Sequence, residues 1–563
     1  MKIPELIDIN LKYSYVDGND KIIHGSAGSR QSGKTDDLSW DTAYDGKHLM
    51  LTVESDKNII FENVSASFGY HFEKTDRVFL NGYQSWTDSH EHTIMGRMHS
   101  LDRVPEAVLK AFDLKAYGDY DFVKYGKRRG QMHGFSYGYI RNGKDFCLTA
   151  SADEKTGFTV IRYDTGKNTV VFEKDLDGIV LNGTRVVLDV FFETGGEEDV
   201  FDRYFEILGI KKCEKKTITG YTSWYNLYEN ISEESVMSDL EAFRNSEDHP
   251  DVFQIDDGYE AAVGDWLKVD PKKFPHGMKI CADRITEEKM IPGIWLAPFA
   301  AKTDSDLSNG HSDWIVRDQN GNKVKGGSNW GGFYALDIYN EEFRAYLKKV
   351  FDTVIGEWGY KFLKLDFLYA ACIISRMGKS RGEIMNDAMD LIREYCGDVT
   401  LLGCGVPLAP AFGKVDYCRI GCDVSLTWND VPHMRLLHRE RVSTKNTILN
   451  TVFRRQLDGR AFRCDPDVYI LREKNNKLKP EDKRTLAFVN KMFGGVLFTS
   501  DNVAEYGENE KKIYSQMKAL KREDFISADI DTAFNVVIKY RNGDDVSEIR
   551  VPLDNIRRSK KDR

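Results

Sequence analysis

The chain has 563 residues, of which 41% are hydrophobic and 30% are charged, and its formal net charge is −10 at pH 7. This composition is typical of a globular protein, and the length predicts two or three domains rather than one. The acidic balance, with no long basic cluster before the tail, argues against nucleic acid as a partner, and no segment is long and apolar enough to span a membrane.

The N-terminus and the cysteines indicate a reducing compartment. The first residues lack the apolar stretch and the cleavage site of a secretory signal. The nine cysteines are scattered and odd in number, and they form neither a disulfide framework nor a CxxC-type zinc site. We therefore expect a cytoplasmic protein, and we expect the basic last residues, 557–563, to be a solvated terminus.

Residues 1–210 are predicted to form an antiparallel β domain. Its short runs are rich in β-branched and aromatic residues, and turns such as Asn142-Gly143 separate them, which favours a sandwich. The loop 81–86 is polar and aromatic, but Trp86 taken alone is more typical of a core residue than of a ligand platform. The clearest strands are 48–53, 157–162 and 184–192.

Residues 211–503 alternate apolar runs of strand length with amphipathic helical stretches, a pattern typical of a parallel sheet. Eight such runs predict a (β/α)8 barrel. The seventh is the least distinct, because residues 446–450 could be the strand in its place. The predicted strands are 218–222, 252–255, 292–297, 362–365, 399–402, 417–420, 461–464 and 495–498 in the barrel, and 532–540 and 548–551 in a small C-terminal β domain, residues 504–563.

The strand 362–365 brings a carboxylate, Asp366, to the end of the predicted barrel. Lys364 lies two residues earlier, so both side chains are on the same face of an otherwise apolar strand. Burying a charge is costly unless the charge is paired or used. For this strand alone, a structural ion pair and a functional site are equally good explanations.

Other predicted strands also end in polar or aromatic residues, which favours a functional site. Active sites of barrels lie at these carboxyl ends, because the loops there converge. Carboxylates bind sugar hydroxyls and aromatic rings pack on pyranose C–H faces, so the set is typical of a carbohydrate site. The residues at the strand ends are Trp224, Tyr225, Asp256, Asp257, Trp295, Asp366, Cys404, Arg419, Asp423, Asp465, Asp467 and Asp501.

Two other interpretations of these acids stay open. Carboxylates near a barrel mouth could bind a divalent cation, although Lys364 and Arg419 would compete for their charge. Imidazole ligands are not evident either, because His433 and His438 fall on a predicted helical stretch. The acids could instead cap helices or pair with basic side chains, which explains any one of them better than it explains the whole set.

Glycoside hydrolysis needs one ionised and one protonated carboxyl at the same bond. In this interpretation Asp366 is ionised beside Lys364. Asp423 is the acid/base, kept protonated by a less polar site or by a nearby carboxylate. The sequence does not give the separation of the two carboxyls, so retention and inversion both stay open.

At these positions the chain resembles glycoside hydrolase family 36 (clan D), whose typical members are α-galactosidases. The resemblance extends over most of the chain, and the motifs are specific in combination. The matching stretches are 81–86, 221–226, 253–259, 264–266, 292–299, 362–367, 402–405 and 419–423.

The resemblance implies an N-terminal β-supersandwich, a catalytic TIM barrel and a small C-terminal β domain. It implies exo-acting, retaining hydrolysis of terminal α-galactosides of the melibiose or raffinose type, without cofactor or metal. In that mechanism Asp366 is the nucleophile that forms the galactosyl-enzyme, and Asp423 is the acid/base. The residues implied to line the galactose site are Asp256, Asp257, Lys364, Arg419, Trp224, Tyr225, Trp295 and Cys404, with Trp86 closing it from the β domain.

Two departures from the larger members of the family matter. The C-terminal part is shorter, so the resemblance implies no oligomeric state. The segment 402–423 lacks the Gly-rich loop of the longer subgroup and is similar to the compact bacterial one. Since that loop faces the sugar's second carbon, α-galactosidase and α-N-acetylgalactosaminidase both stay open, as do linkage, transglycosylation and pH optimum. A non-catalytic carbohydrate-binding protein is disfavoured by the pair Asp366 and Asp423.

Overall fold

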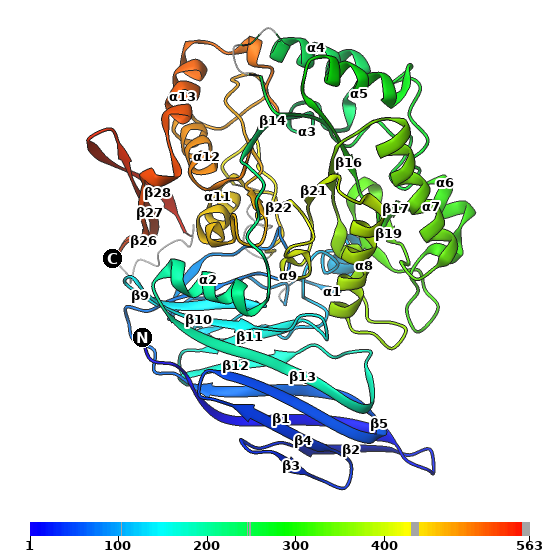
Figure 1. The fold of residues 1–563 in the computed structure, drawn as a ribbon, viewed down its shortest axis with the longest axis vertical. Helices are drawn as coiled ribbons and strands as arrows, with labels where there is room; N and C mark the ends of the chain where they lie inside the picture. The colour runs from blue at the N-terminus through cyan, green and yellow to red at the C-terminus, as the bar shows by residue number, and fades with distance from the viewer. Residues whose placement is uncertain (103, 245, 247–248, 430–437, 554–563) are drawn as a thin grey trace.

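A computed structural model describes residues 1–102, 104–244, 246, 249–429 and 438–553. Figure 1 shows an N-terminal antiparallel sheet at the bottom, a parallel barrel above it and a small antiparallel sheet at the side near the C-terminus. The predicted fold class is confirmed. The predicted domain boundaries at residues 210 and 503 stay predictions.

The N-terminal part is a 13-stranded antiparallel sheet built around two long paired strands, β5 and β13. The three strands predicted most clearly lie in β5, β11 and β13, and the Asn142-Gly143 turn joins β9 to β10 with Gly143 at φ +60°. The strands are β1 (Glu5–Val16), β2 (Ile22–Ala27), β3 (Gly33–Lys34), β4 (Ser39–Tyr44), β5 (His48–Gly69), β6 (Arg77–Leu80), β7 (Glu91–Thr93), β8 (Gln131–Phe135), β9 (Tyr137–Asn142), β10 (Asp145–Ser151), β11 (Thr159–Asp164), β12 (Thr169–Lys174) and β13 (Val180–Gly195).

The central part is a parallel sheet that closes into a barrel. Its strands are mostly apolar and mostly buried, as expected where helices cover a parallel sheet. In order they are β14 (Ile218–Thr222), β15 (Val252–Ile255), β16 (Ile291–Leu296), β20 (Phe362–Leu365), β21 (Thr400–Gly403), β22 (Tyr417–Arg419), β23 (Arg463–Asp465), β24 (Val468–Tyr469) and β25 (Val496–Thr499).

The seventh strand position is occupied by two short strands. β23 pairs with β22, and β24 pairs with β25, so the two together complete the ring. Only Pro466 and Asp467 separate them, and proline cannot donate a ladder hydrogen bond. The alternative strand at 446–450 lies instead in the helix α11 (Thr444–Phe453). The least distinct of the eight predicted strands is therefore confirmed.

Helices surround the barrel, and two of them begin at side chains that accept a backbone hydrogen bond. Asn340 caps α7 by accepting a hydrogen bond from the Phe343 amide at 3.0 Å, and Ser232 accepts one from the Ser235 amide at 3.2 Å at the start of α4. The helices are α1 (Glu106–Ala111), α2 (Glu197–Ile207), α3 (Trp224–Leu227), α4 (Glu233–Arg244), α5 (Gly277–Glu287), α6 (Asp306–Gly310), α7 (Glu341–Asp352), α8 (Arg381–Cys396), α9 (Leu408–Ala411), α12 (Pro480–Phe493) and α13 (Glu508–Ala519).

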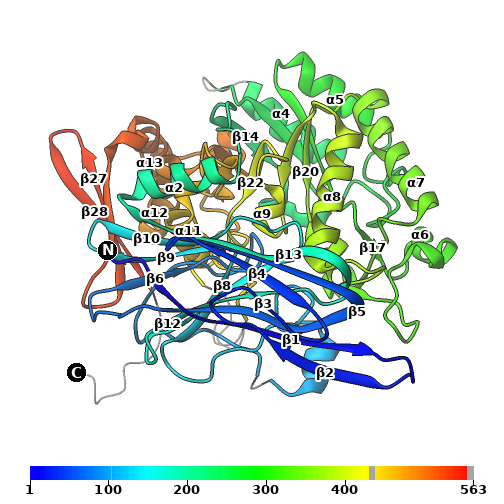
Figure 2. The same ribbon diagram turned by 60° about the horizontal axis from the view of Figure 1, so that its bottom comes forward.

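Two small antiparallel sheets complete the fold. One, inserted between β16 and β20, was not predicted and consists of β17 (Ala300–Lys302), β18 (Lys325–Gly327) and β19 (Phe333–Ala335). The other is the predicted C-terminal sheet of β26 (Phe525–Ile530), β27 (Asn535–Asn542) and β28 (Asp545–Pro552). Figures 1 and 2 both show it beside the end of the barrel, where Phe488 of α12 contacts Tyr540 of β27 edge-on.

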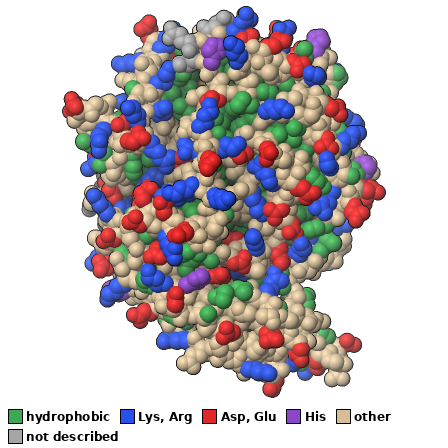
Figure 3. All heavy atoms as spheres, viewed as in Figure 1, with side chains coloured by type: hydrophobic (Ala, Val, Ile, Leu, Met, Phe, Trp, Pro, Cys, Tyr) green, Lys and Arg blue, Asp and Glu red, His purple; other side chains and the backbone are tan. Residues whose placement is uncertain are grey.

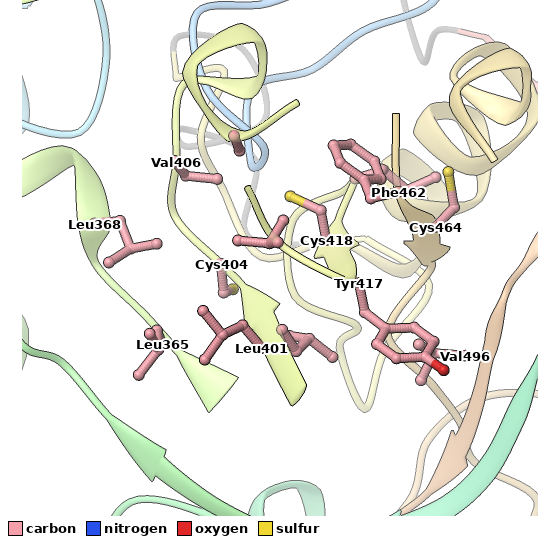
Figure 4. Packing of buried hydrophobic residues seen from close by; sticks show 14 of the residues in the cluster. Leu365, Leu368, Leu401, Cys404, Val406, Tyr417, Cys418, Phe462, Cys464 and Val496 are labelled. Atoms are coloured by element: carbon pink, nitrogen blue, oxygen red, sulfur yellow. The ribbon is translucent and has the colours of Figure 1, made fainter. Parts of the chain in front are cut away.

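One apolar core runs through the barrel and into the N-terminal sheet. Tyr204 and Phe205 of α2 pack on Phe412, which follows α9 in the barrel. Figure 4 shows the barrel side of this core, where Cys404 lies among Leu365 and Leu401. All nine cysteines lie in the described part of the chain, and none of them forms a disulfide.

The surface carries charges of both signs. On the face seen in Figure 3, basic and acidic side chains are interspersed rather than gathered by sign. Among the described residues, no helix has the length and hydropathy needed to cross a membrane.

Candidate active site

Asp366 follows β20 and is held by donors on both carboxylate oxygens. The Trp295 indole Nε1 donates to Oδ2 at 3.1 Å, and the Phe367 amide donates to Oδ1 at 2.9 Å. Phe367 has a left-handed backbone, with φ 53°, a strained conformation that turns its amide toward the carboxylate. The Asp366 side chain is 10% exposed. It is therefore oriented but still reachable.

Lys364 lies on the same face of β20 as Asp366, as predicted, but its closer partner is another acid. Its Nζ is 2.8 Å from Asp256 Oδ2 and 4.0 Å from Asp366 Oδ2. Burial alone would lower the pKa of the Lys364 ammonium, but Asp256 and Asp366 raise it above its usual range. Lys364 is thus a permanent cation between the ends of β15 and β20.

Asp256 is enclosed by donors from neighbouring strands. Besides Lys364, its Oδ2 accepts hydrogen bonds from Gln254 Nε2 at 2.6 Å and from Thr222 Oγ1 at 3.1 Å. Its Oδ1 accepts the Asp257 amide at 3.0 Å. Four donors fix this carboxyl in one orientation, which suits a group that must recognise a defined hydroxyl.

Arg419, the last residue of β22, contacts three carboxylates. Its Nε is 2.9 Å from Asp465, its Nη1 is 2.9 Å from Asp423 and its Nη2 is 2.8 Å from Asp467. Tyr225 donates its hydroxyl to Asp467. The acids at the seventh strand, which have an ordinary explanation singly, therefore belong to one network with the predicted acid/base.

Asp423 has the accessibility and the electrostatic setting of an acid. Its side chain is 37% exposed, more than that of any other carboxylate in the network. Burial raises its pKa, Arg419 and Lys364 oppose the increase, and Asp366 and Asp256 add to it. Burial likewise raises the pKa of Asp467 to about 7. The effect of the Asp366 charge on Asp423 is the electrostatic link between the two predicted catalytic carboxyls.

Asp257 contacts a residue that sequence reasoning missed. Trp330, in the insertion between β18 and β19, donates its indole Nε1 to Asp257 Oδ2 at 2.8 Å. Its ring packs against Trp295 and Phe367, with centroids 6.0 and 4.8 Å away. The glycine-rich run 326–332 is the sequence feature that could have predicted this contact, because such a run is typical of a turn and not of a regular strand or helix. A bend there brings Trp330 to the site.

Trp86 reaches the barrel from the N-terminal sheet. Its Nε1 donates to Cys404 Sγ at 3.3 Å, and its ring packs against Phe367 and Tyr369. Trp86 is partly buried against the core, and its indole also contacts residues of the barrel. Cys404 is fully buried, and burial raises the pKa of its thiol well above its usual range. Cys404 is thus an uncharged residue that lines the site.

The structure gathers most, but not all, of the predicted site residues. Asp256, Lys364, Asp366 and Trp295 form one group, and Arg419, Asp423 and Tyr225 form a second group through Asp467. Trp224 is half-exposed and packs edge-on against Tyr228 instead.

His438, one of the two histidines considered as metal ligands, does not join this site. His438 is in a loop, not in a helix as predicted, and its Nε2 lies 3.0 Å from the Leu114 carbonyl. His433 is outside the described residues. Within the described part, no group of three or more His, Cys, Asp or Glu side chains is arranged to hold a metal ion.

Comparisons with known proteins agree with this geometry. The family model described as Melibiase matches residues 221–385. An α-galactosidase of Escherichia coli is 27% identical over 208 residues, which are 35% of this chain and 28% of that protein. The α-galactosidase AgaA of Geobacillus stearothermophilus is 22% identical over 43% of this chain and 33% of its own length. The chain thus spans about a third or less of the length of these two relatives.

Solved structures match over much more of the chain. The α-galactosidase TtGalA of Thermus thermophilus, in complex with p-nitrophenyl α-D-galactopyranoside, has a TM-score of 0.69 and 26% identity, covering 89% of this chain and 95% of that one. A family 36 enzyme, AgaA, shares the fold over 99% of this chain with a TM-score of 0.59 at 11% identity. In its fold, in the residues that the family model matches and in its strand-end carboxylates, the chain is thus similar to α-galactosidases, family 36 enzymes among them.

Proposed function

We propose that the protein is a retaining, exo-acting α-galactosidase that removes terminal α-linked galactose from oligosaccharides of the melibiose or raffinose type. The observation that carries the proposal is a pair of carboxyls in contrasting settings at one barrel mouth. Asp366 is held by two hydrogen-bond donors next to the Lys364 cation, whereas Asp423 is more exposed and has a raised pKa. A retaining glycosidase needs this division of roles.

In the first step, an oxygen of Asp366 attacks the anomeric carbon and the bond to the leaving oxygen breaks. Asp423 gives its proton to that oxygen, so the leaving sugar departs as a neutral alcohol. The product is a β-galactosyl ester on Asp366. In the second step, Asp423, now ionised, takes a proton from water, and the water oxygen displaces Asp366 from the anomeric carbon. Two inversions leave the product with the α configuration.

The other predicted site residues bind the sugar in this proposal. Asp256 and Asp257 would accept galactose hydroxyls, and Trp295 would pack on the ring while its indole N–H holds Asp366. Trp86 and Trp330 both pack against the Phe367 ring, with centroid distances of 5.0 and 4.8 Å. In this proposal they limit the site to the end of a sugar chain. Support also comes from TtGalA, whose structures hold a nitrophenyl galactoside and stachyose.

The direct test is hydrolysis of 4-nitrophenyl α-galactoside, with the α-N-acetylgalactosaminide alongside. We expect wild type to prefer the galactoside and Asp366→Ala to lose at least about 10⁴-fold in kcat, because no other group can form the intermediate. Asp304→Ala is the matched control, since its side chain is 71% exposed in the same barrel.

Two outcomes of this test would change the proposal, and thermal melting serves as the control for folding. Unchanged melting of Asp366→Ala separates lost chemistry from lost folding. A large preference for the acetamido sugar would identify an α-N-acetylgalactosaminidase instead. Turnover of neither substrate by folded wild type would favour a carbohydrate-binding protein.

A further inference from the structure

Next to the galactose site, a buried carboxyl that has no role so far contacts Asp257. This residue, Glu260, is 6% exposed, and Asp257 is 4% exposed. The turn after β15 has Gly258 at φ +116°, a left-handed conformation that favours glycine, and it folds Glu260 back toward Asp257. The Gly258 amide donates to Glu260 Oε2 at 3.3 Å, and the two carboxyl groups are hydrogen-bonded to each other.

The charged groups around Asp257 and Glu260 favour a state in which the pair holds one proton. Among the described residues, no basic side chain forms an ion pair with Asp257 or Glu260. Lys273, whose charge acts on Glu260, donates from its Nζ to the carbonyls of Glu229 and Gly258, at 2.7 and 3.0 Å. Glu229 adds a further negative charge. Two buried carboxyls in contact cannot both ionise, so the pair retains a proton.

Electrostatics and a third residue fix the state of this pair. Burial raises the pKa of Asp257, and Glu260 raises it further. Burial also raises the pKa of Glu260, which the hydrogen bond to Asp257 partly offsets. Trp330 occupies Asp257 Oδ2 with its indole N–H at 2.8 Å. The other face of the carboxyl group is therefore the one available to Glu260 and to a substrate hydroxyl.

Trp330 is itself held in place from the N-terminal part. Its backbone is left-handed, with φ 56° and ψ 22°. The Tyr117 hydroxyl accepts the Ser328 amide at 2.7 Å and donates to Asn329 Oδ1 at 2.7 Å. The strained turn is thus anchored at both preceding residues, which keeps the indole N–H on Asp257.

We propose that Glu260 is a positioning residue of the galactose site, sharing one proton with Asp257 so that Asp257 meets the sugar as a neutral hydrogen-bonding group. The inference rests on the proposed function and deepens it. Neighbouring Asp256 is paired with Lys364, so the two adjacent acids differ in character. With the shared proton in the hydrogen bond to Glu260, Asp257 presents an acceptor oxygen to the sugar, and the pair carries one negative charge rather than two.

The test is the galactose dissociation constant, measured by calorimetry from about pH 6 to pH 9. In wild type, loss of the shared proton should weaken galactose binding by about tenfold for each pH unit above the pKa of the pair. In Glu260→Gln, the amide donates to Asp257 without titrating, so this fall in affinity should vanish. Glu229→Gln removes a nearby charge outside the hydrogen bond, so the alkaline fall in affinity should remain and should move to lower pH.

The outcomes separate this inference from the proposed function. Equal pH profiles for wild type and Glu260→Gln overturn the shared proton, and so does a wild-type affinity that is constant over the range. Failure of wild type to bind galactose at any pH counts against the proposed function instead. If Glu260→Gln does not fold, Trp330→Phe is used. It keeps the ring but loses the donor, and should weaken binding about fivefold while keeping the alkaline fall.

Discussion

A single guanidinium at the end of β22 ties the predicted acid/base to its surroundings. Arg419 has five donors in a planar fork, and it contacts Asp423, Asp465 and Asp467 with three different nitrogens. A lysine could not span the three acids, because its ammonium is a point charge. The geometry therefore explains why an arginine and not a lysine lies here, and it leaves one acid, Asp423, partly exposed.

The pH dependence of activity should follow the raised pKa of Asp423. As the acid, Asp423 must be protonated before attack, and burial raises its pKa. Hence the alkaline limb of kcat/KM should follow Asp423, with kcat/KM falling as the pH rises through the folded-state pKa of this coupled group. In Asp423→Asn we expect kcat on raffinose to fall by about 10²–10⁴-fold, and the alkaline limb to disappear.

The control for this prediction is Asp304→Asn, an exposed carboxyl with the same chemical change. It should keep the wild-type rate and the alkaline limb, measured as kcat/KM against pH. If Asp423→Asn retained the full alkaline limb with raffinose, the limb would belong to another group and the acid/base assignment would be wrong.

Sequence patterns found the charged residues at strand ends better than their partners. Asp366, Lys364 and Arg419 are predictable because a charge in an apolar strand is costly unless it is used. Glu260 and Trp330 were not, because their position depends on turns with left-handed residues rather than on strand alternation. A local sequence pattern predicts on which face of a strand a side chain lies, but it does not predict the course of an inserted loop.

At the scale of elements, the loop that carries Trp86 is held by a buried arginine at the end of α11. Arg454 donates to Asn81 Oδ1 at 2.9 Å, to the Ser85 carbonyl at 2.7 Å and to the Ile420 carbonyl at 2.9 Å. Burial lowers the pKa of Arg454 to about 10, which leaves the guanidinium charged at neutral pH. One side chain thus joins the N-terminal loop to the end of β22.

Arg454→Lys should loosen this loop. A lysine cannot reach all of these acceptors, so buried carbonyls lose their donors, and the free energy of unfolding should fall by about 3 kcal/mol. Because Trp86 borders the site, KM should rise by more than kcat falls. Denaturant unfolding and steady-state kinetics measure the two effects.

The matched control is Arg203→Lys, whose exposed pair with Glu206 on α2 should leave the free energy of unfolding nearly unchanged. Equal stability losses in the two variants would mean that the Arg454 hydrogen bonds do not hold the loop.

For the whole molecule, the sequence predicted the architecture because each layer has its own hydrophobic period. The barrel strands are continuous apolar runs, and the seventh was predictable despite Pro466 because apolar residues flank the break. The sheet of β17, β18 and β19 was not, because its strands have three residues each. The contact between Trp86 and Cys404 was expected only from family resemblance, since no local pattern brings residues 318 positions apart together.

The most direct measurement is the product that Asp366→Ala forms from 4-nitrophenyl α-galactoside in the presence of azide. Without the carboxylate, azide can occupy its place and attack the anomeric carbon from the same side, since nitrophenolate leaves without an acid. We predict recovered turnover and β-galactosyl azide, identified by NMR. Absence of any galactosyl azide from a folded variant, or formation of the α anomer, would contradict the assignment of Asp366 as the nucleophile.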